Sequence, residues 1–170
     1  KQLLADCQQD FRSWLDAGLT NRTGPFVPLR VGPNEWGYLK RTNDGRFDVN
    51  LQWSMAAGAA FPYFDGTLIF GDSKYRKVAL EMADFFLTIQ EKEGFWGCKY
   101  LVAPIRGSGG ERWEIINQRT YQKKDTGEMC RFQDYFQTGP FYLMLAAYKQ
   151  TSDEKYRAAA IRAADYLLLV

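Results

Sequence analysis

A stretch of sixteen residues occurs twice in this chain, and both copies have the apolar spacing of an amphipathic helix. Residues 72–87 align without gaps on residues 153–168, which lie 81 residues further on (153 − 72). The identical positions are Asp72/Asp153, Lys74/Lys155, Tyr75/Tyr156, Arg76/Arg157, Ala79/Ala160, Ala83/Ala164, Asp84/Asp165 and Leu87/Leu168. The same offset places Gln52 on Gln133, so the repeated unit is a helical hairpin. Such units bury their apolar faces by stacking on neighbours, which predicts an all-α array of hairpins.

Each hairpin is expected to pair an inner helix that is apolar nearly all round with an outer helix that has one apolar stripe. The inner helices are predicted over residues 49–64 and 132–148. Pro62 is expected to kink or end the first, and residues 139–140, Gly-Pro, to interrupt the second.

The outer helices begin at clear capping residues. Gly71-Asp72-Ser73 predicts the start of one that ends before Gly94, and Ser152 or Asp153 predicts the cap of the last helix. Asp84 and Asp165 recur on these outer helices, where we expect them to fix the hairpin geometry or to face solvent.

The remaining segments are read from apolar spacing and turn residues. Residues 2–17 predict a further amphipathic helix that Gly18 ends, followed by a loop rich in Gly and Pro. Residues 36–47 predict a short β-hairpin around an Asn-Asp-Gly turn. Residues 94–130 form a long connection, which on a helical scaffold is expected to be either functional or poorly ordered.

Composition excludes several classes of partner and chemistry. The 22 basic and 20 acidic residues give a net charge of +2 and form no basic block, so no nucleic-acid partner is expected. No apolar run approaches the roughly 18 residues that span a bilayer, so no membrane partner is expected either. Histidine is absent, which argues against Ser-His-Asp and Cys-His catalysis and against a metal site. No cofactor is expected.

Three cysteines, Cys7, Cys98 and Cys130, lack metal-type spacing. We interpret them as small buried apolar residues. The alternative is a disulfide between Cys98 and Cys130 in an oxidising compartment.

The outer-helix pattern Lys-Tyr-x-x-x-Ala-x-x-x-Ala-Asp-(Phe/Tyr)-(Phe/Leu)-Leu, after an apolar inner helix and a short turn, is typical of (α/α)6 toroids. In the first copy the chain continues into Gly94-Phe-Trp-Gly97, which is similar to a loop that these families carry into the central cavity. The chain resembles the six-hairpin glycosidase superfamily, which includes unsaturated glucuronyl and rhamnogalacturonyl hydrolases. Polysaccharide lyases and sugar epimerases share this architecture. Terpene-cyclase-like and lanthipeptide-cyclase-like toroids are alternative families with the same helical pattern.

The resemblance implies a partial ring with short β-hairpin-like loop insertions, in one repeat domain over residues 1–170. A closed ring of six hairpins needs more than the two and a half that this chain holds, and the last helix reaches Val170 without a stop signal. We therefore expect these residues to be part of a larger catalytic toroid.

In such rings the active site lies where outer helices pass to inner ones, which here means the loops 18–48 and 91–133. These loops and the helix starts after them supply flat aromatic faces for pyranose rings and planar polar groups for sugar hydroxyls. The substrate-binding candidates are Trp36, Trp53, Trp96, Trp113, Arg131 and Gln133. The alternative is that some of the aromatics, Trp53 among them, fill the core.

Hydrolysis of a glycosidic bond generally uses two carboxyl groups. Asp134, among aromatics at the start of an inner helix, is the candidate general acid or base, since apolar surroundings raise a carboxyl pKa. Asp48, expected at the start of the other inner helix, is its candidate partner. The alternative for both is helix capping. The loops offer three weaker candidates, Glu35, Glu111 and Glu114.

The sequence therefore favours a glycoside hydrolase that acts on oligosaccharides or polysaccharide fragments. A polysaccharide lyase of the same architecture, with Tyr121 or Tyr135 as its base, is one alternative. A catalytically silent helical-repeat module that binds glycans or proteins is the other.

Overall fold

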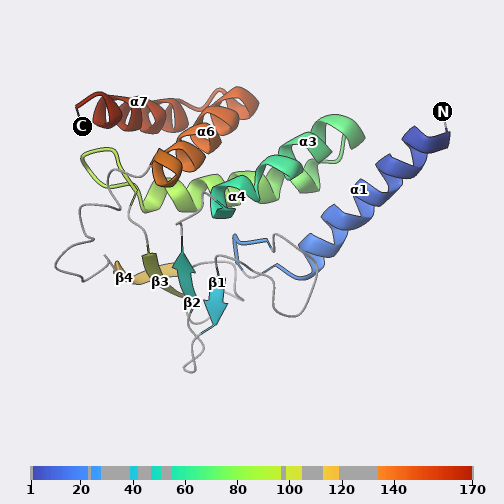
Figure 1. Cartoon of the computed structure of the whole chain (residues 1–170), viewed down its shortest axis with the longest axis horizontal. Helices are drawn as coiled ribbons and strands as arrows, with labels where there is room; N and C mark the ends of the chain where they lie inside the picture. The colour runs from blue at the N-terminus through green and yellow to red at the C-terminus, as the bar shows by residue number, and fades with distance from the viewer. Residues whose placement is uncertain are drawn as a thin grey trace.

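The structure is a computed structural model that describes residues 2–22, 24–27, 39–41, 47–50, 55–96, 99–104, 113–118 and 134–169. In the strands, and at residues 55–56 and 134–136, it describes the backbone alone. The chain is predominantly helical, as predicted, and a small antiparallel sheet lies on one side of the helices (Figure 1).

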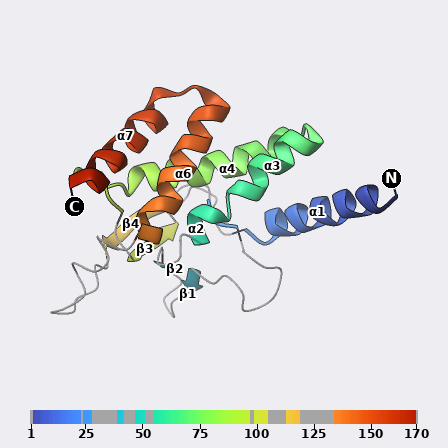
Figure 2. The same ribbon diagram turned by 45° about the horizontal axis from the view of Figure 1, so that its top comes forward.

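The helices are α1 (Gln2–Thr20), α2 (Met55–Gly58), α3 (Phe61–Phe70), α4 (Ser73–Thr88), α6 (Asp134–Thr151) and α7 (Glu154–Leu169). The strands are β1 (Leu39–Arg41), β2 (Phe47–Asn50), β3 (Lys99–Pro104) and β4 (Trp113–Gln118). Helices α3 and α4 pack as one hairpin, α6 and α7 pack as the next, and α4 packs on α6 between them. Figure 2 shows the helices in sequence from α1 at one edge to α7 at the other.

The two similar stretches, residues 72–87 and 153–168, each form the second helix of a helical hairpin. Each hairpin turns at a residue with positive φ, Gly71 at 68° and Ser152 at 57°. Each outer helix then begins with an aspartate cap. The carboxylates of Asp72 and Asp153 accept hydrogen bonds, both 3.0 Å long, from the backbone N–H groups of Lys74 and Lys155.

The apolar stripes of the outer helices form the centre of the core. On α4 the buried side chains are Tyr75, Val78, Ala79, Met82, Ala83, Phe85 and Phe86, and on α7 they are Tyr156, Ala159, Ala160 and Ala163. The small alanines of α7 allow that helix to approach its neighbours closely. The predicted stripes are thus confirmed, and these outer helices carry much of the apolar burial that stabilises the fold.

The inner helix expected over residues 49–64 is only partly correct: residues 49–50 belong to β2, whereas residues 55–58 and 61–64 are helical. The chain is still extended at Asn50, and helical structure begins at Met55 and continues in α3 to Phe70. Pro62 lies in the first turn of α3, where a missing N–H costs no hydrogen bond, so it starts this helix instead of ending it. The second inner helix, α6, runs through Pro140 without the expected interruption.

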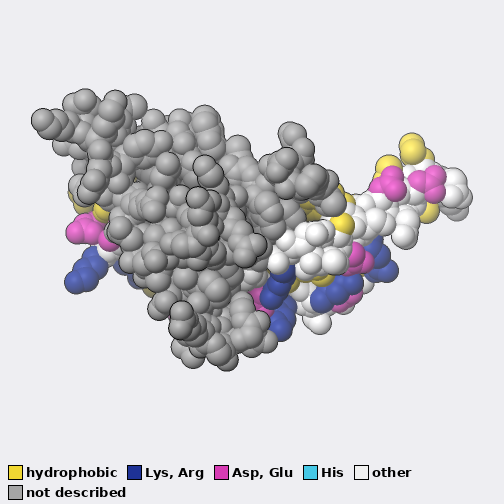
Figure 3. Space-filling model, turned by 90° about the horizontal axis from the view of Figure 1, so that it is seen from below, with side chains coloured by type: hydrophobic (Ala, Val, Ile, Leu, Met, Phe, Trp, Pro, Cys, Tyr) yellow, Lys and Arg dark blue, Asp and Glu magenta, His cyan; other side chains and the backbone are white. Residues whose placement is uncertain are grey.

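Helix α1 runs past Gly18, which was expected to end it. A Cβ at this position would lie 2.0 Å from the hydroxyl oxygen of Tyr63, so Gly18 allows α1 to approach α3 closely. The other end of α1 extends away from the remaining helices (Figure 3). Its Leu3 and Leu4 are 76% and 65% exposed.

The sheet joins the two long insertions between helices. Strands β1 and β2 form the predicted hairpin, with Arg41 opposite Phe47. Strands β3 and β4 come from the connection after α4, and β2 pairs with β3, so the strand order is β1-β2-β3-β4. Two segments that are distant in sequence therefore form one antiparallel sheet beside the inner helices.

Candidate functional site

Asp48, the candidate partner carboxyl, lies in β2 and not at the start of a helix. Its neighbours across the sheet are Lys40 of β1 and Leu101 of β3. The expected helical position is wrong because the chain stays extended here. The capping alternative falls with it, since a residue inside a strand cannot cap a helix.

Asp134, the candidate general acid or base, is the first residue of α6. The expected inner helix began two residues earlier, so this prediction is close to the observed start. Helix α2 contacts α6, so the two inner segments pack on each other. Figure 2 shows that α6 begins on the side of the helical layer where the sheet lies.

Gln137 anchors the first turn of α6 to the segment that leads into β3. Its Oε1 accepts a hydrogen bond of 2.9 Å from the backbone N–H of Trp96, and its Nε2 donates one of 3.0 Å to the carbonyl of the same residue. The side chain is 1% exposed. Buried amides are costly unless paired, and here both polar atoms are paired. Gln137 was not among the predicted site residues, although a glutamine inside an apolar helix was a usable signal.

Trp96 is a core residue in this structure. Its side chain is fully buried, and its indole N–H donates a hydrogen bond of 2.9 Å to the carbonyl of Phe86. A ring with both faces covered cannot stack on a sugar. The predicted substrate-binding role of Trp96 is therefore wrong, and Trp96 is a residue of the core.

The backbone gives the positions of three further candidates. Trp113 and Glu114 lie in β4, where Trp113 pairs with Pro104, and Tyr135 lies in the first turn of α6. The candidates that lie outside the described residues are Trp36, Trp53, Arg131, Gln133, Glu35, Glu111 and Tyr121, together with Cys98 and Cys130. Cys7 is exposed, so its expected burial is wrong.

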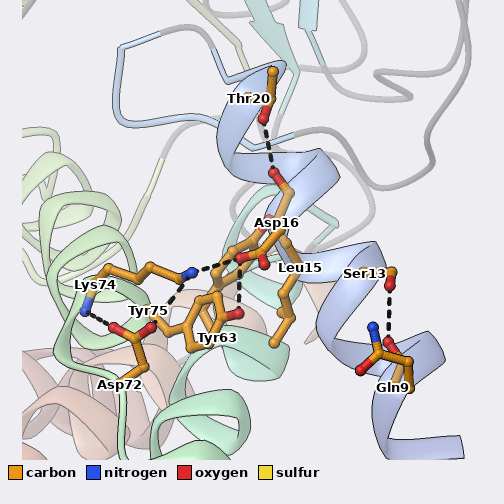
Figure 4. Close-up of polar contacts among 9 residues, drawn as sticks. All are labelled: Gln9, Ser13, Leu15, Asp16, Thr20, Tyr63, Asp72, Lys74 and Tyr75. Atoms are coloured by element: carbon orange, nitrogen blue, oxygen red, sulfur yellow. Dashed lines mark hydrogen bonds and ion pairs between the residues drawn. The ribbon is translucent and has the colours of Figure 1, made fainter. Parts of the chain in front are cut away.

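Polar groups meet between successive outer helices, in an arrangement that we call the Asp–Lys–Tyr clasp. Asp16 of α1 lies 2.8 Å from the ammonium nitrogen of Lys74, and the hydroxyl of Tyr75 donates a hydrogen bond of 2.8 Å to the same carboxylate oxygen (Figure 4). Lys74 also pairs with Asp72 at 3.3 Å. One carboxylate of α1 thus holds the first turn of α4.

The second clasp has the same geometry one hairpin later. Asp84 of α4 lies 2.8 Å from the ammonium of Lys155, and the hydroxyl of Tyr156 donates a hydrogen bond of 2.8 Å to it. Asp84 was expected to fix the geometry of its own hairpin or to face solvent; it is half-exposed and joins its hairpin to the next one. The first clasp was missed because Asp16 lies 68 residues before Asp84 (84 − 16), which differs from the repeat offset of 81.

The clasps change the protonation equilibria of their members. The hydrogen bond from Lys74 lowers the pKa of Asp16, although partial burial opposes it. Burial raises the pKa of Tyr156 to about 12, and its hydrogen bond to the Asp84 carboxylate adds to the shift. The lowered pKa of Asp16 and the raised pKa values of Tyr75 and Tyr156 both favour the hydrogen-bonded arrangement, which stabilises the fold.

No family model, curated protein or solved structure matches this chain. Among the described residues, no helix is long and apolar enough to cross a bilayer. The same residues contain no group of acidic or cysteine side chains suited to holding a metal ion.

Proposed function

We propose that this chain belongs to a carbohydrate-active enzyme, a glycoside hydrolase of the (α/α)6 toroid type that cleaves oligosaccharides or polysaccharide fragments. The observation that carries the proposal is the position of the sheet. The strand that contains Asp48 belongs to a sheet on the same side of the helical layer as the start of α6, where Asp134 lies (Figure 2).

The proposed chemistry uses these two carboxyl groups. Asp134, as the acid, donates a proton to the leaving glycosidic oxygen, while Asp48 activates water or attacks the anomeric carbon. A carboxyl that donates a proton near neutral pH needs a raised pKa, which apolar neighbours provide by disfavouring the ionised form. The aromatic residues on either side of Asp134, Phe132 and Tyr135, are suited to that role.

Substrate contacts would come from the remaining aromatic and polar candidates. Flat rings stack on pyranose faces, while guanidinium and amide groups hydrogen-bond hydroxyls or an acidic sugar. The proposed contacts are Trp36, Trp53, Trp113, Arg131 and Gln133. Gln137 is a positioning residue, because its two hydrogen bonds hold the helix that begins with Asp134.

The test compares Asp134→Asn with the unchanged chain on a panel of neutral and uronic-acid oligosaccharides. Replacing a catalytic carboxyl should lower turnover by about a hundredfold or more and leave substrate affinity within a few-fold. Asp65→Asn is the matched control, because Asp65 is an exposed aspartate of α3. Equal turnover by Asp134→Asn and Asp65→Asn would remove Asp134 from the proposal.

A further inference from the structure

One face of α4 is covered by the hairpin that follows it. Arg76 donates a hydrogen bond to the backbone carbonyl of Gln150 in the last turn of α6, and Asp84 holds α7 through the second clasp. Leu80 and Leu87 lie on the same face and pack against the core. The four positions, 76, 80, 84 and 87, follow helical spacing, so α4 presents one continuous docking face to α6 and α7.

Helix α7 has the same pattern of residues on the corresponding face, and no helix in the described part of the chain covers it. The residues 81 positions later are Arg157, Ile161, Asp165 and Leu168, so each polar or apolar type is kept. Ile161 is 47% exposed and Leu168 is 84% exposed. Figure 2 shows α7 as the outermost helix of the layer, on the side opposite α1.

The polar groups of this face have no partner on another helix among the described residues. Arg157 pairs with Glu154 of its own helix, at 3.0 Å, whereas the equivalent Arg76 reaches across to α6. Asp165 makes no hydrogen bond or ion pair within the described ranges, whereas Asp84 and Asp16 each bind a Lys-Tyr pair. Three residues of this face are exposed where their counterparts on α4 are half-buried, namely Arg157, Ile161 and Leu168. The fourth, Asp165, lacks the Lys-Tyr pair that Asp84 binds.

We propose that this face of α7, formed by Arg157, Ile161, Asp165 and Leu168, docks a further helical hairpin of the same repeat from outside these 170 residues. The last turn of its inner helix accepts the Arg157 guanidinium. Its outer helix begins with a Lys-Tyr pair that closes a third clasp on Asp165. A docked hairpin that takes the Asp165 carboxylate out of water favours a cation opposite it, and the two existing clasps supply the geometry.

A second copy of this chain does not fit the surface. Its own Lys-Tyr pairs are already bound to Asp16 and Asp84. The free end of α1 carries Asp6 and Cys7 at the positions that match Lys74 and Tyr75 when Asp16 is aligned with Asp84. Asp6 opposite Asp165 would place like charges together, which disfavours head-to-tail assembly.

The test adds a second copy of residues 90–169 directly after Val170. Because Val170 corresponds to Ile89 at the repeat offset of 81, the added copy continues the repeat in register. Hydrogen exchange of the α7 amides is measured in the original and lengthened chains. Docking should slow exchange in α7 by about tenfold or more, the factor that corresponds to ~1.4 kcal/mol. Asp165→Asn should remove most of this gain in the lengthened chain and change nothing in the original.

A charge reversal makes the test specific for the clasp. Asp165→Lys should abolish the slowing, and Lys155→Asp in the added copy alone should restore it. Asp65→Lys is the matched control and should leave the slowing intact. The proposal is overturned if the added copy contributes no helix by circular dichroism. It is equally overturned if α7 exchanges at the original rate, or if the slowing survives Asp165→Lys. The proposed glycosidase activity plays no part in these readouts, so either proposal can fail alone.

Discussion

Asp84 joins two outer helices through a single carboxylate. Hydrogen bonds to charged groups contribute about 1.5–3 kcal/mol each in favourable settings. The Asp84 side chain is 52% exposed, so solvent screens much of the attraction to Lys155. The hydroxyl of Tyr156, which is buried, is the less screened partner. The clasp is therefore expected to contribute modestly to stability while fixing the angle between α4 and α7.

Asp84→Asn should lower the free energy of unfolding by about 1–2 kcal/mol, because the amide retains only part of the hydrogen bonding and none of the charge. Urea unfolding followed by circular dichroism measures this change. Asp165→Asn is the matched control in the other repeat and should shift stability by less than about 0.5 kcal/mol. Equal losses in both variants would show that the clasp has no energetic role.

The raised pKa of Tyr156 makes stability depend on pH at the alkaline end. The pKa is about 12 in the folded chain and about 10 for a free tyrosine. The folded state therefore holds this proton more tightly, and the resulting stability is fully present below pH 10 and lost as pH rises through 12. Unfolding free energies measured across this range should fall, and Tyr156→Phe should remove part of the slope. Tyr142→Phe, at an exposed tyrosine of α6, is the control. An unchanged slope in Tyr156→Phe would contradict this account.

At the scale of elements, the helices with local signals were predictable and those set by tertiary contacts were not. The start of α4 follows from Gly71-Asp72-Ser73, because turn and cap depend only on neighbouring residues. The start of the helix expected over residues 49–64 was placed too early, because an apolar run without a clear period fits a buried strand as well as a helix. Gly18 was misread as a stop because its contact with Tyr63 lies 45 residues away (63 − 18).

Gly94 is a glycine that the docking of α7 requires. Its φ is +101°, and a Cβ there would lie 2.1 Å from the backbone carbonyl oxygen of Arg162. Gly94→Ala should destabilise the chain by about 2–4 kcal/mol, since both the backbone strain and the clash with α7 must be relieved. Gly58→Ala is the control, because a Cβ at Gly58 meets nothing within 4 Å. It should be neutral or stabilise its helix by up to about 1 kcal/mol. Thermal unfolding of both variants decides the comparison.

Gln137→Leu tests the anchor between α6 and the segment before β3. The change leaves the N–H and carbonyl of Trp96 buried without their partners, at a cost of about 1–3 kcal/mol for each unsatisfied group. We expect a loss of about 2–4 kcal/mol in urea unfolding. Gln150→Leu, at a partly exposed site near the other end of α6, should change stability by less than about 1 kcal/mol. Similar effects at both positions would contradict a specific anchor.

At the scale of the whole molecule, the chain is a row of helices in which each outer helix is clasped to the next. Stability in such arrays is approximately a sum of unit and neighbour terms, so each clasp acts locally. The helical character of α4 and α7 could be predicted from sequence, because each has its own cap and apolar stripe. The sheet could not, since β2 and β3 pair across about 50 residues and no local pattern specifies that register.

The candidate site was predictable only in part for the same reason. Asp134 was placed near the start of a helix because that helix has its own signals. Asp48 was assigned to the wrong element, because its environment depends on the long-range pairing with β3. Trp96 was read as a loop aromatic, whereas its contacts with Phe86 and Gln137 place it in the core.

The most direct test of the proposed function is the incorporation of heavy oxygen from labelled water into oligosaccharide products. A glycoside hydrolase adds one oxygen atom from water at the newly released anomeric carbon, so mass spectrometry should find one label in each new reducing end. The label should disappear with turnover in Asp134→Asn and persist in Asp65→Asn. Unlabelled products with a new double bond would identify elimination instead. They would contradict the hydrolase account, as would the absence of any product across the panel.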